Sequence, residues 1–170
     1  MIRLLEKLNF ETFSVYKFSI DYPNVCRVEF NAKSRRESGD VVFHFPDKEK
    51  LYISWGKLEE ARKRFQTIEG QAEHGIKTLS KSSSVRGTER IKKDMIKVNS
   101  HKAVYNHIRL NRASPGLFSG GKTTLHDSYS VHLQCDKSSR YFVIYTLLSP
   151  NAPKDFEDLM NTIVASFKCH

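Results

Sequence analysis

The chain lacks any long hydrophobic run. Its 170 residues are 39% hydrophobic, yet no apolar stretch approaches the roughly 18 residues that a membrane-spanning helix needs. The first residues, MIRLLEKLNFET, also lack the features of a secretory signal. Glu6 and Lys7 break their apolar stretch, and no small-residue cleavage site follows. We therefore expect no membrane span and a cytoplasmic protein.

Paired cysteines are also lacking. The three cysteines, Cys26, Cys135 and Cys169, are odd in number, far apart and without C-x-x-C spacing. This pattern is not typical of a disulfide framework or a zinc site. The seven histidines are scattered too: His126 and His132 are six residues apart, and no H-E-x-x-H motif accompanies them. We expect reduced cysteines, surface histidines, and neither a metal nor a cofactor.

Acidic residues are scarce in one part of the chain. Between residues 77 and 112, ten basic residues are opposed by only Glu89 and Asp94. This segment therefore carries a net charge of +8 (ten minus two), out of +9 for the whole chain. Such asymmetry favours an anionic partner. The candidate partner-binding residues are Lys81, Arg86, Arg90, Lys92, Lys93, Lys97, Lys102, Arg109, Arg112 and Lys122.

Two kinds of partner fit this charge. A protein with an acidic face could bind the basic segment together with the glycine-containing loop at 116–124. Nucleic acid is the alternative, because Tyr105 and Arg109 share one face of an expected strand and could offer an aromatic and charged surface. A third explanation needs no partner, since lysines on an exposed strand prevent edge-to-edge aggregation. Lys92 and Lys97 fall on opposite strand faces, which would divide the charge.

One segment, residues 116–123, matches the phosphate-loop pattern G-x-x-x-x-G-K-[ST] at every position. A working phosphate loop lies between a buried strand and a helix whose N-terminal amides bind the phosphates. Here the preceding NRASP is not a buried strand end, and HDSYSVHLQC (126–135) alternates as a strand does. We interpret the match as a glycine-rich hairpin loop. No nucleophile elbow or acid/base pair suggests other catalysis, so we do not expect an enzyme.

Hydrophobic periodicity predicts an α+β fold. Period-two patterns predict strands at 12–22, 28–30, 41–45, 51–55, 91–98, 103–110, 126–135 and 140–148. The last of these is almost continuously apolar, which is typical of a central strand covered on both faces. Helical spacing predicts one long helix from 57 to 79 and a closing helix at 156–167. Short connections favour antiparallel pairing, and both helices must cover a sheet. We expect one domain over 1–170, with about twelve peripheral N-terminal residues.

Four stretches of the chain resemble the PsbP-like family. They are similar to its opening strand, second strand, strand pair and closing helix: FSIDYP (18–23), VVFHFPD (41–47), VNSHKAVYNHIRL (98–110) and FEDLMNTIVASFK (156–168). The resemblance implies an antiparallel sheet flanked by helices, an α/β/α sandwich. The family includes the photosystem II subunit PsbP and a nuclear-import factor that binds the GTPase Ran, so it implies a non-catalytic protein-binding role. Val25 and Cys26 stand where the family often has tryptophan, and no functional residue is carried over.

Overall fold

The computed structural model describes residues 8–114 and 121–170. Within these ranges, a large antiparallel sheet has the spatial order β3 (Arg27–Phe30), β4 (Gly39–His44), β5 (Lys50–Lys57), β9 (Arg140–Leu147), β8 (Thr123–Cys135), β7 (His101–Ala113) and β6 (Val85–Val98). A separate hairpin contains β1 (Phe10–Val15) and β2 (Phe18–Pro23). The helices are α1 (Leu58–Phe65), α2 (Ile68–Ser80) and α3 (Phe156–Ser166). No helix among the described residues is long and apolar enough to cross a membrane.

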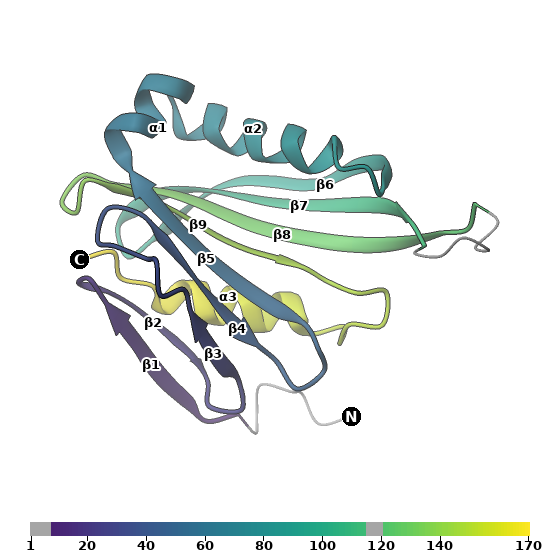
Figure 1. Cartoon of the computed structure of the whole chain (residues 1–170), viewed down its shortest axis with the longest axis horizontal. Helices are drawn as coiled ribbons and strands as arrows, with labels where there is room; N and C mark the ends of the chain where they lie inside the picture. The colour runs from purple at the N-terminus through teal and green to yellow at the C-terminus, as the bar shows by residue number, and fades with distance from the viewer. Residues whose placement is uncertain (1–7, 115–120) are drawn as a thin grey trace.

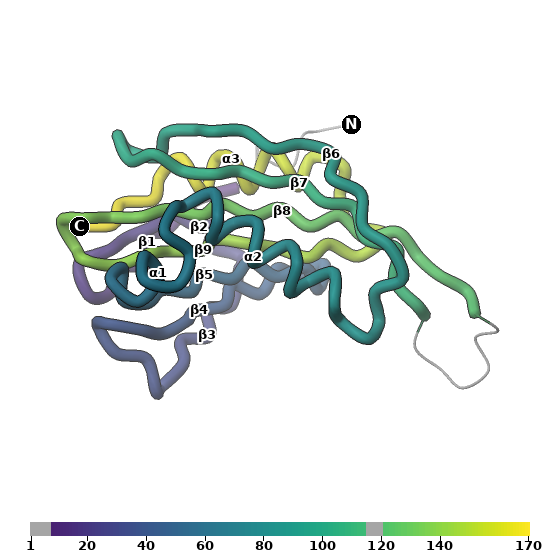
Figure 2. The backbone as a smooth tube through the Cα atoms, turned by 90° about the horizontal axis from the view of Figure 1, so that it is seen from above, coloured from purple at the N-terminus to yellow at the C-terminus, as the bar shows by residue number. Residues whose placement is uncertain are grey.

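Helices cover both faces of the large sheet (Figure 1). α2 packs against β6, β7 and β8 on one face, and α3 lies on the opposite face with the β1–β2 hairpin beside it. An isolated bridge between Ser19 and Lys168 joins this hairpin to the chain that follows α3. Seen from above in Figure 2, β3 and β4 extend beyond α1 and α2 at one edge. The expected α+β fold, an antiparallel sheet flanked by helices, is confirmed.

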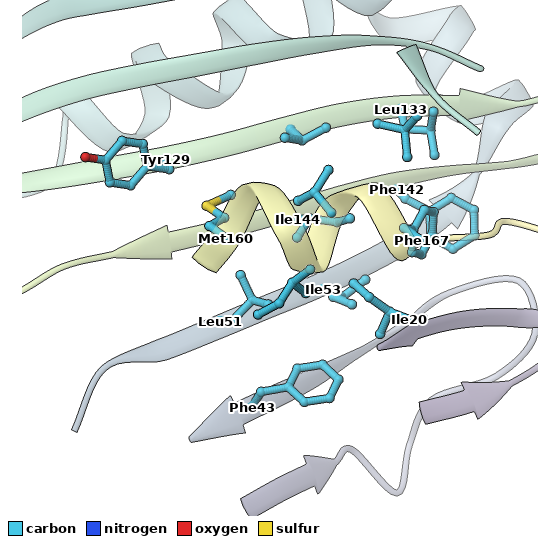
Figure 3. Close-up of a cluster of buried hydrophobic side chains, with 14 of the residues drawn as sticks. Ile20, Phe43, Leu51, Ile53, Tyr129, Leu133, Phe142, Ile144, Met160 and Phe167 are labelled. Atoms are coloured by element: carbon cyan, nitrogen blue, oxygen red, sulfur yellow. The ribbon is translucent and has the colours of Figure 1, made fainter. Parts of the chain in front are cut away.

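The main core lies between the large sheet and α3. Alternate residues of neighbouring strands point into it, including Leu51 and Ile53 of β5 and Phe142 and Ile144 of β9, each no more than 1% exposed. Figure 3 shows these side chains close to α3. The predicted apolar stripe of the closing helix is confirmed, with Phe156, Leu159, Met160, Ile163 and Val164 all buried. Burial of each side chain of this size stabilises the folded state by about 1.5–3 kcal/mol relative to leaving it exposed.

The single strand expected at 12–22 is wrong, because the chain reverses direction within it. Tyr16 and Lys17 have φ values of 50° and 65° and form a two-residue turn between β1 and β2. Such turns usually contain asparagine or glycine, which accept positive φ at low cost. The sequence carries no such signal here. The expected alternation was nevertheless correct for Phe18 and Ile20, which are fully buried.

The single helix expected from 57 to 79 is also wrong. α1 ends at Phe65, Gln66 adopts a φ of 60°, and α2 starts at Ile68. Thr67 caps α2, since its Oγ1 accepts a hydrogen bond from the Gly70 amide at 3.0 Å. A threonine in this role satisfies one of the free amides at a helix start. The apolar spacing did not reveal the break, because Phe65 and Ile68 lie on either side of it and are three residues apart, as they would be in one continuous helix.

The strand expected to be central, β9, is the middle strand of the sheet, as predicted. The prediction that this strand is covered on both faces is wrong. Phe142 and Ile144 point into the α3 core, whereas Tyr145 on the other face is 36% exposed. The Tyr145 ring stacks on Tyr52 of β5, with ring centroids 4.9 Å apart. α1 and α2 leave this part of the sheet uncovered because α2 packs over β6, β7 and β8.

Candidate functional site

Most of the candidate basic residues lie on β6 and β7. β6 forms one edge of the large sheet and begins at Val85, earlier than the expected Ile91. Five exposed cations therefore occupy one edge strand, and we call them the basic edge: Arg86, Arg90, Lys92, Lys93 and Lys97. The other candidates lie at the end of α2 (Lys81), on β7 (Lys102, Arg109 and Arg112) and just before β8 (Lys122).

Several of these cations pair with acidic residues of α2. The Arg90 guanidinium donates to both carboxylate oxygens of Glu73, at 2.8 and 2.7 Å, and Lys93 Nζ donates to the same carboxylate at 2.9 Å. The hydrogen bonds from Lys93 and Arg90 hold the pKa of Glu73 below its usual value. Lys102 pairs more loosely with Glu69, at 3.4 Å. Part of the basic charge is therefore used to attach the sheet to α2.

Other candidates lie on the opposite face of the same strands. The strand register places Lys97 beside Lys102, which pairs with Glu69 on the face covered by α2. Lys92 lies beside His107 instead. Cross-strand neighbours share a face, and Lys92 and Lys97 are five residues apart, so they point to opposite sides of the sheet. Arg112 contacts the Ser84 hydroxyl through Nε and Nη2, at 3.4 and 3.2 Å. The ten candidate residues therefore do not form one continuous surface, and the expected division of charge is confirmed.

Tyr105 is buried rather than available for stacking. It is 5% exposed, and its hydroxyl donates to a carboxylate oxygen of Glu157 on α3 at 2.5 Å. Burial, and secondarily Glu157, raises the pKa of the phenol. Lys92 Nζ lies 5.8 Å from the ring centroid. The expected aromatic and basic surface for nucleic acid, formed with Arg109, is therefore wrong: the ring fills the contact between β7 and α3.

Arg109 lines a cleft of about 560 Å³ beside the start of α3. Its Nε donates to Asp127 Oδ1 at 3.1 Å, and His107 Nε2 lies 2.8 Å from the same oxygen. Tyr129 and Glu157 also line the cleft, and burial raises the pKa of Tyr129 to about 12. These side chains hold one another in place. The Arg109 side chain is 39% exposed, and the exposed Lys154 is a second cation in the lining of the cleft.

A second cleft, of about 800 Å³, lies at the end of the sheet where β8 turns into β9. Its lining includes the cations Arg36, Lys57, Arg62, Lys63, Lys137 and Arg140 and the acids Glu37, Glu59 and Asp136. None of these residues is among the candidates that the sequence suggested. They come from three separated segments, and no single segment among them has the strong charge bias of residues 77–112. Only the fold brings these cations together.

The phosphate-loop match does not lead into a helix. Thr123 is the first residue of strand β8, so Lys122 precedes an extended ribbon. Gly121 has a φ of +73°, a conformation that glycine accepts readily. The strand expected after the glycines is confirmed, and it offers no row of free helical amides to a phosphate. Gly116 and Gly120 lie outside the described residues.

The expectation of three reduced cysteines is wrong. Cys135 and Cys169 form a disulfide, and Cys26 is free and buried, which raises the pKa of its thiol to about 12. His101 and His170 adjoin the pair, and the four donor atoms all lie within 4.8 Å of one another. We call these four residues the Cys–His cluster. Spacing rules missed it because the residues come from two strand ends and the chain terminus; the adjacent Cys169 and His170 were the available signal.

Two histidines expected at the surface are buried. His107 is 8% exposed and His132 is 5% exposed. Burial lowers the pKa of His132 to about 4, and its Nδ1 has no hydrogen-bond partner among the described residues. Gly75 of α2 lies directly over it: a Cβ added there would lie 3.3 Å from His132 Cε1. His132 therefore belongs to the interface between β8 and α2.

The architecture is that of the PsbP-like fold. The solution structure of cyanobacterial PsbP (CyanoP) from Synechocystis sp. PCC 6803 matches with a TM-score of 0.58 and 12% identity, over 96% of this chain and 94% of that one. The Ran-binding protein Mog1p from Saccharomyces cerevisiae matches with a TM-score of 0.55 and 10% identity, over 95% and 96%. A protein of unknown function, PA94 from Pseudomonas aeruginosa, gives 0.53 and 9%, over 95% and 98%.

Sequence comparisons add nothing to this likeness. No protein-family model and no curated protein matches the chain. At identities of 9–12% the structural likeness establishes the fold alone, since one fold supports many unrelated functions. Any functional conclusion must therefore come from the surfaces and side chains described above.

Proposed function

We propose that the chain is a non-catalytic binding domain that docks a protein partner with an acidic face along the basic edge. The observation that carries this proposal is the character of β6. It is an exposed edge strand with five cations against Glu89 and Asp94, a net charge of +3 (five minus two). A surface of this sign attracts an acidic partner and orients its approach.

The basic edge also has the shape and the apolar contacts that a docking strand requires. An edge strand presents unpaired backbone groups, to which an extended segment can add as a further strand. Ile91 and Met95 are 41% and 45% exposed on β6 and would provide apolar contact between the cations. Arg86 and Lys97 form no ion pair with any described residue, so their charges are available to a partner.

Two further considerations favour a protein over nucleic acid. Single-stranded nucleic acid binds where aromatic side chains stack on its bases, and the burial of Tyr105 removes the ring expected for that role. Among the fold neighbours, Mog1p is named as a Ran-binding protein, which is a precedent for protein binding on this architecture. Binding of nucleic acid or another polyanion by charge alone is the alternative that the experiment must separate.

The proposal is tested by measuring affinity for three labelled probes over a range of salt: a polyglutamate peptide, a single-stranded oligonucleotide and a duplex. The variant Arg86→Glu/Lys97→Glu reverses two unpaired charges of the basic edge. The control variant Lys33→Glu/Lys50→Glu makes the same change in net charge at exposed positions elsewhere. We expect polyglutamate to bind, the first variant to abolish most of that binding, and the control to preserve it.

Each other outcome contradicts a stated part of the proposal. An equal loss in both variants would mean that total charge, and not the basic edge, drives binding. Preferred binding of an oligonucleotide, with the steep fall in affinity that phosphate contacts produce as salt rises, would establish the alternative. Absence of binding to all three probes at low salt would remove charge complementarity as the basis of function.

A further inference from the structure

The Cys–His cluster brings together two sulfur and two nitrogen donors from three parts of the fold. His101 is the first residue of β7 and Cys135 is the last residue of β8. Cys169 and His170 end the chain after α3, and Figure 1 shows the C-terminus near the end of the sheet where β8 turns into β9. Two cysteines and two histidines are one of the common ligand sets of structural zinc.

Three sulfur–nitrogen distances within the cluster are close to those of a tetrahedral zinc site. Zinc binds sulfur at about 2.3 Å and histidine nitrogen at about 2.0–2.1 Å, so sulfur and nitrogen ligands are separated by about 3.6 Å. In the structure, Cys169 Sγ lies 3.3 Å from both His101 Nε2 and His170 Nδ1. Cys135 Sγ lies 3.5 Å from His170 Nδ1. The sulfur–nitrogen separations therefore already suit one ion, whereas the two sulfurs, bonded to each other in the disulfide, must move apart after reduction to the roughly 3.8 Å that separates two tetrahedral sulfur ligands.

A buried cation next to the cluster is an independent second observation. Arg140 is 2% exposed and its Nε has no partner among the described residues. Its guanidinium donates to the carbonyl oxygens of Tyr16, at 2.8 Å, and of Cys169, at 3.4 Å. The strand register places it directly beside Cys135. A neighbouring arginine favours the thiolate form of cysteine, which is the form that binds metal.

We propose that the Cys–His cluster, with its disulfide reduced, binds one Zn²⁺ ion tetrahedrally and thereby fastens the C-terminal tail to the ends of β7 and β8. Reduction by a trialkylphosphine consumes one water: the phosphine becomes a phosphine oxide, the sulfur–sulfur bond breaks, and each sulfur gains a proton. Zinc then displaces these two thiol protons as the two Zn–S bonds form. The exposed His170 leaves one side of the cluster open to solvent, so an ion can reach it.

Anchoring the tail has a clear structural purpose. Cys169 and His170 follow the short segment in which Lys168 pairs with Ser19 of β2, and the Asn99 side chain donates to the Phe167 carbonyl. The tail therefore lies between the β1–β2 hairpin and the turn that joins β6 to β7. A metal at its end would link the tail to β7 and β8, because the four ligands come from these three parts of the chain.

The test uses the full chain, reduced with a phosphine under native conditions until a denatured aliquot shows all three cysteines as free thiols. The reduced chain is titrated with Zn²⁺, and bound metal is measured by mass spectrometry after gel filtration. Co²⁺ is used in parallel, because thiolate ligation gives a charge-transfer absorption that other ligands do not. We expect one metal per chain, release of two protons, a thiolate-to-cobalt band, and a higher melting temperature of the reduced chain with zinc.

Variants decide whether the cluster holds the metal. Two ligand variants are compared, Cys135→Ser and His170→Ala. His170 is exposed, so His170→Ala tests the site even if the replacement of the buried Cys135 prevents folding. We expect His170→Ala to weaken zinc binding by more than about 100-fold, since losing even an outer hydrogen-bond partner of a ligand costs about 10–100-fold. The controls His74→Ala and Cys26→Ala should keep full binding. No uptake by the reduced chain, a cobalt spectrum without thiolate absorption, or unchanged binding in His170→Ala would each overturn the proposal.

Discussion

The Tyr105 hydroxyl donates a hydrogen bond to the Glu157 carboxylate at 2.5 Å and so joins β7 to the first turn of α3. The two residues are 52 positions apart in the chain. Tyr105 packs near Tyr129, with ring centroids 6.5 Å apart, and together they close the main core at this end. Because of this contact, the Tyr105 ring stabilises the fold and is not available at the surface beside the basic edge.

Replacing Tyr105 with phenylalanine should lower the free energy of unfolding by about 1–2 kcal/mol, because the charged acceptor loses its donor while the ring stays in place. Urea denaturation monitored by circular dichroism measures the change. Tyr145→Phe is the matched control, since that tyrosine is 36% exposed and stacks on Tyr52; its effect should be within about 0.5 kcal/mol. Equal effects of both substitutions would contradict a specific role for the Tyr105 hydroxyl.

The break between α1 and α2 depends on Thr67. Thr67→Ala removes the side-chain acceptor of the Gly70 amide and should cost about 1 kcal/mol of stability. Thr78→Ala, within α2, exchanges a threonine that bonds back to the His74 carbonyl for the best helix former and should be neutral or slightly stabilising. Thermal denaturation of both variants makes the comparison. A neutral Thr67→Ala would mean that packing alone starts the second helix.

Burial of His132 makes stability depend on pH. Its pKa is about 4 in the folded chain against 6.5 for the ordinary side chain, so between these values the unfolded chain binds a proton that the folded chain does not. Stability should therefore rise with pH across this window, and lowering the pH from 6.5 to 4 should remove up to about 3 kcal/mol.

His132→Gln should flatten that slope, because glutamine does not titrate. Urea unfolding at several pH values between 4 and 7 measures the effect. His74→Gln, on α2, serves as the control and should leave the slope unchanged. Parallel slopes in the parent chain and in His132→Gln would show that other groups cause the loss of stability at low pH.

Glu73 offsets two cations of the basic edge, so its removal should strengthen binding of acidic probes. In Glu73→Gln, Arg90 and Lys93 lose their carboxylate partner. One additional net charge at contact distance in water is worth about 1 kcal/mol, so we expect about fivefold tighter polyglutamate binding at low salt. Fluorescence anisotropy measures this affinity. Glu60→Gln removes the same charge from α1 and should leave the affinity nearly unchanged; weaker binding in Glu73→Gln would count against the basic edge.

Lys122 should have no role in nucleotide binding. Because Thr123 starts a strand, the chain after the glycines lacks the helical amides that bind phosphates. Isothermal titration with Mg-ATP or Mg-GTP should give no saturable signal for the parent chain or for Lys122→Ala. A measurable complex that Lys122→Ala abolishes would restore the phosphate-loop interpretation.

Local patterns predicted the elements whose buried side chains recur at a fixed spacing along the chain. Alternation identified the buried faces of β4 and β8, and helical spacing identified the buried face of α3, because each of these elements buries its apolar side chains on a single face. Two errors arose where the backbone departs from these rules. Tyr16 and Lys17 turn without glycine or asparagine, and Gln66 interrupts a helix whose apolar spacing continues across the break. At the first of these turns, the Tyr16 hydroxyl donates to the Ser34 carbonyl and the Tyr16 carbonyl accepts from Arg140, and a local pattern does not contain contacts with such distant residues.

The sequence by itself determined the α+β class, the apolar faces, the excess of positive charge and the strand after the glycines, because these depend on side chains a few residues apart. Only the tertiary structure decided which groups meet. Strand order and the packing of α2 put Arg90 and Lys93 beside Glu73. The path of the chain after α3 brought its last two residues to the ends of β7 and β8. Such meetings depend on pairing and packing across the whole chain.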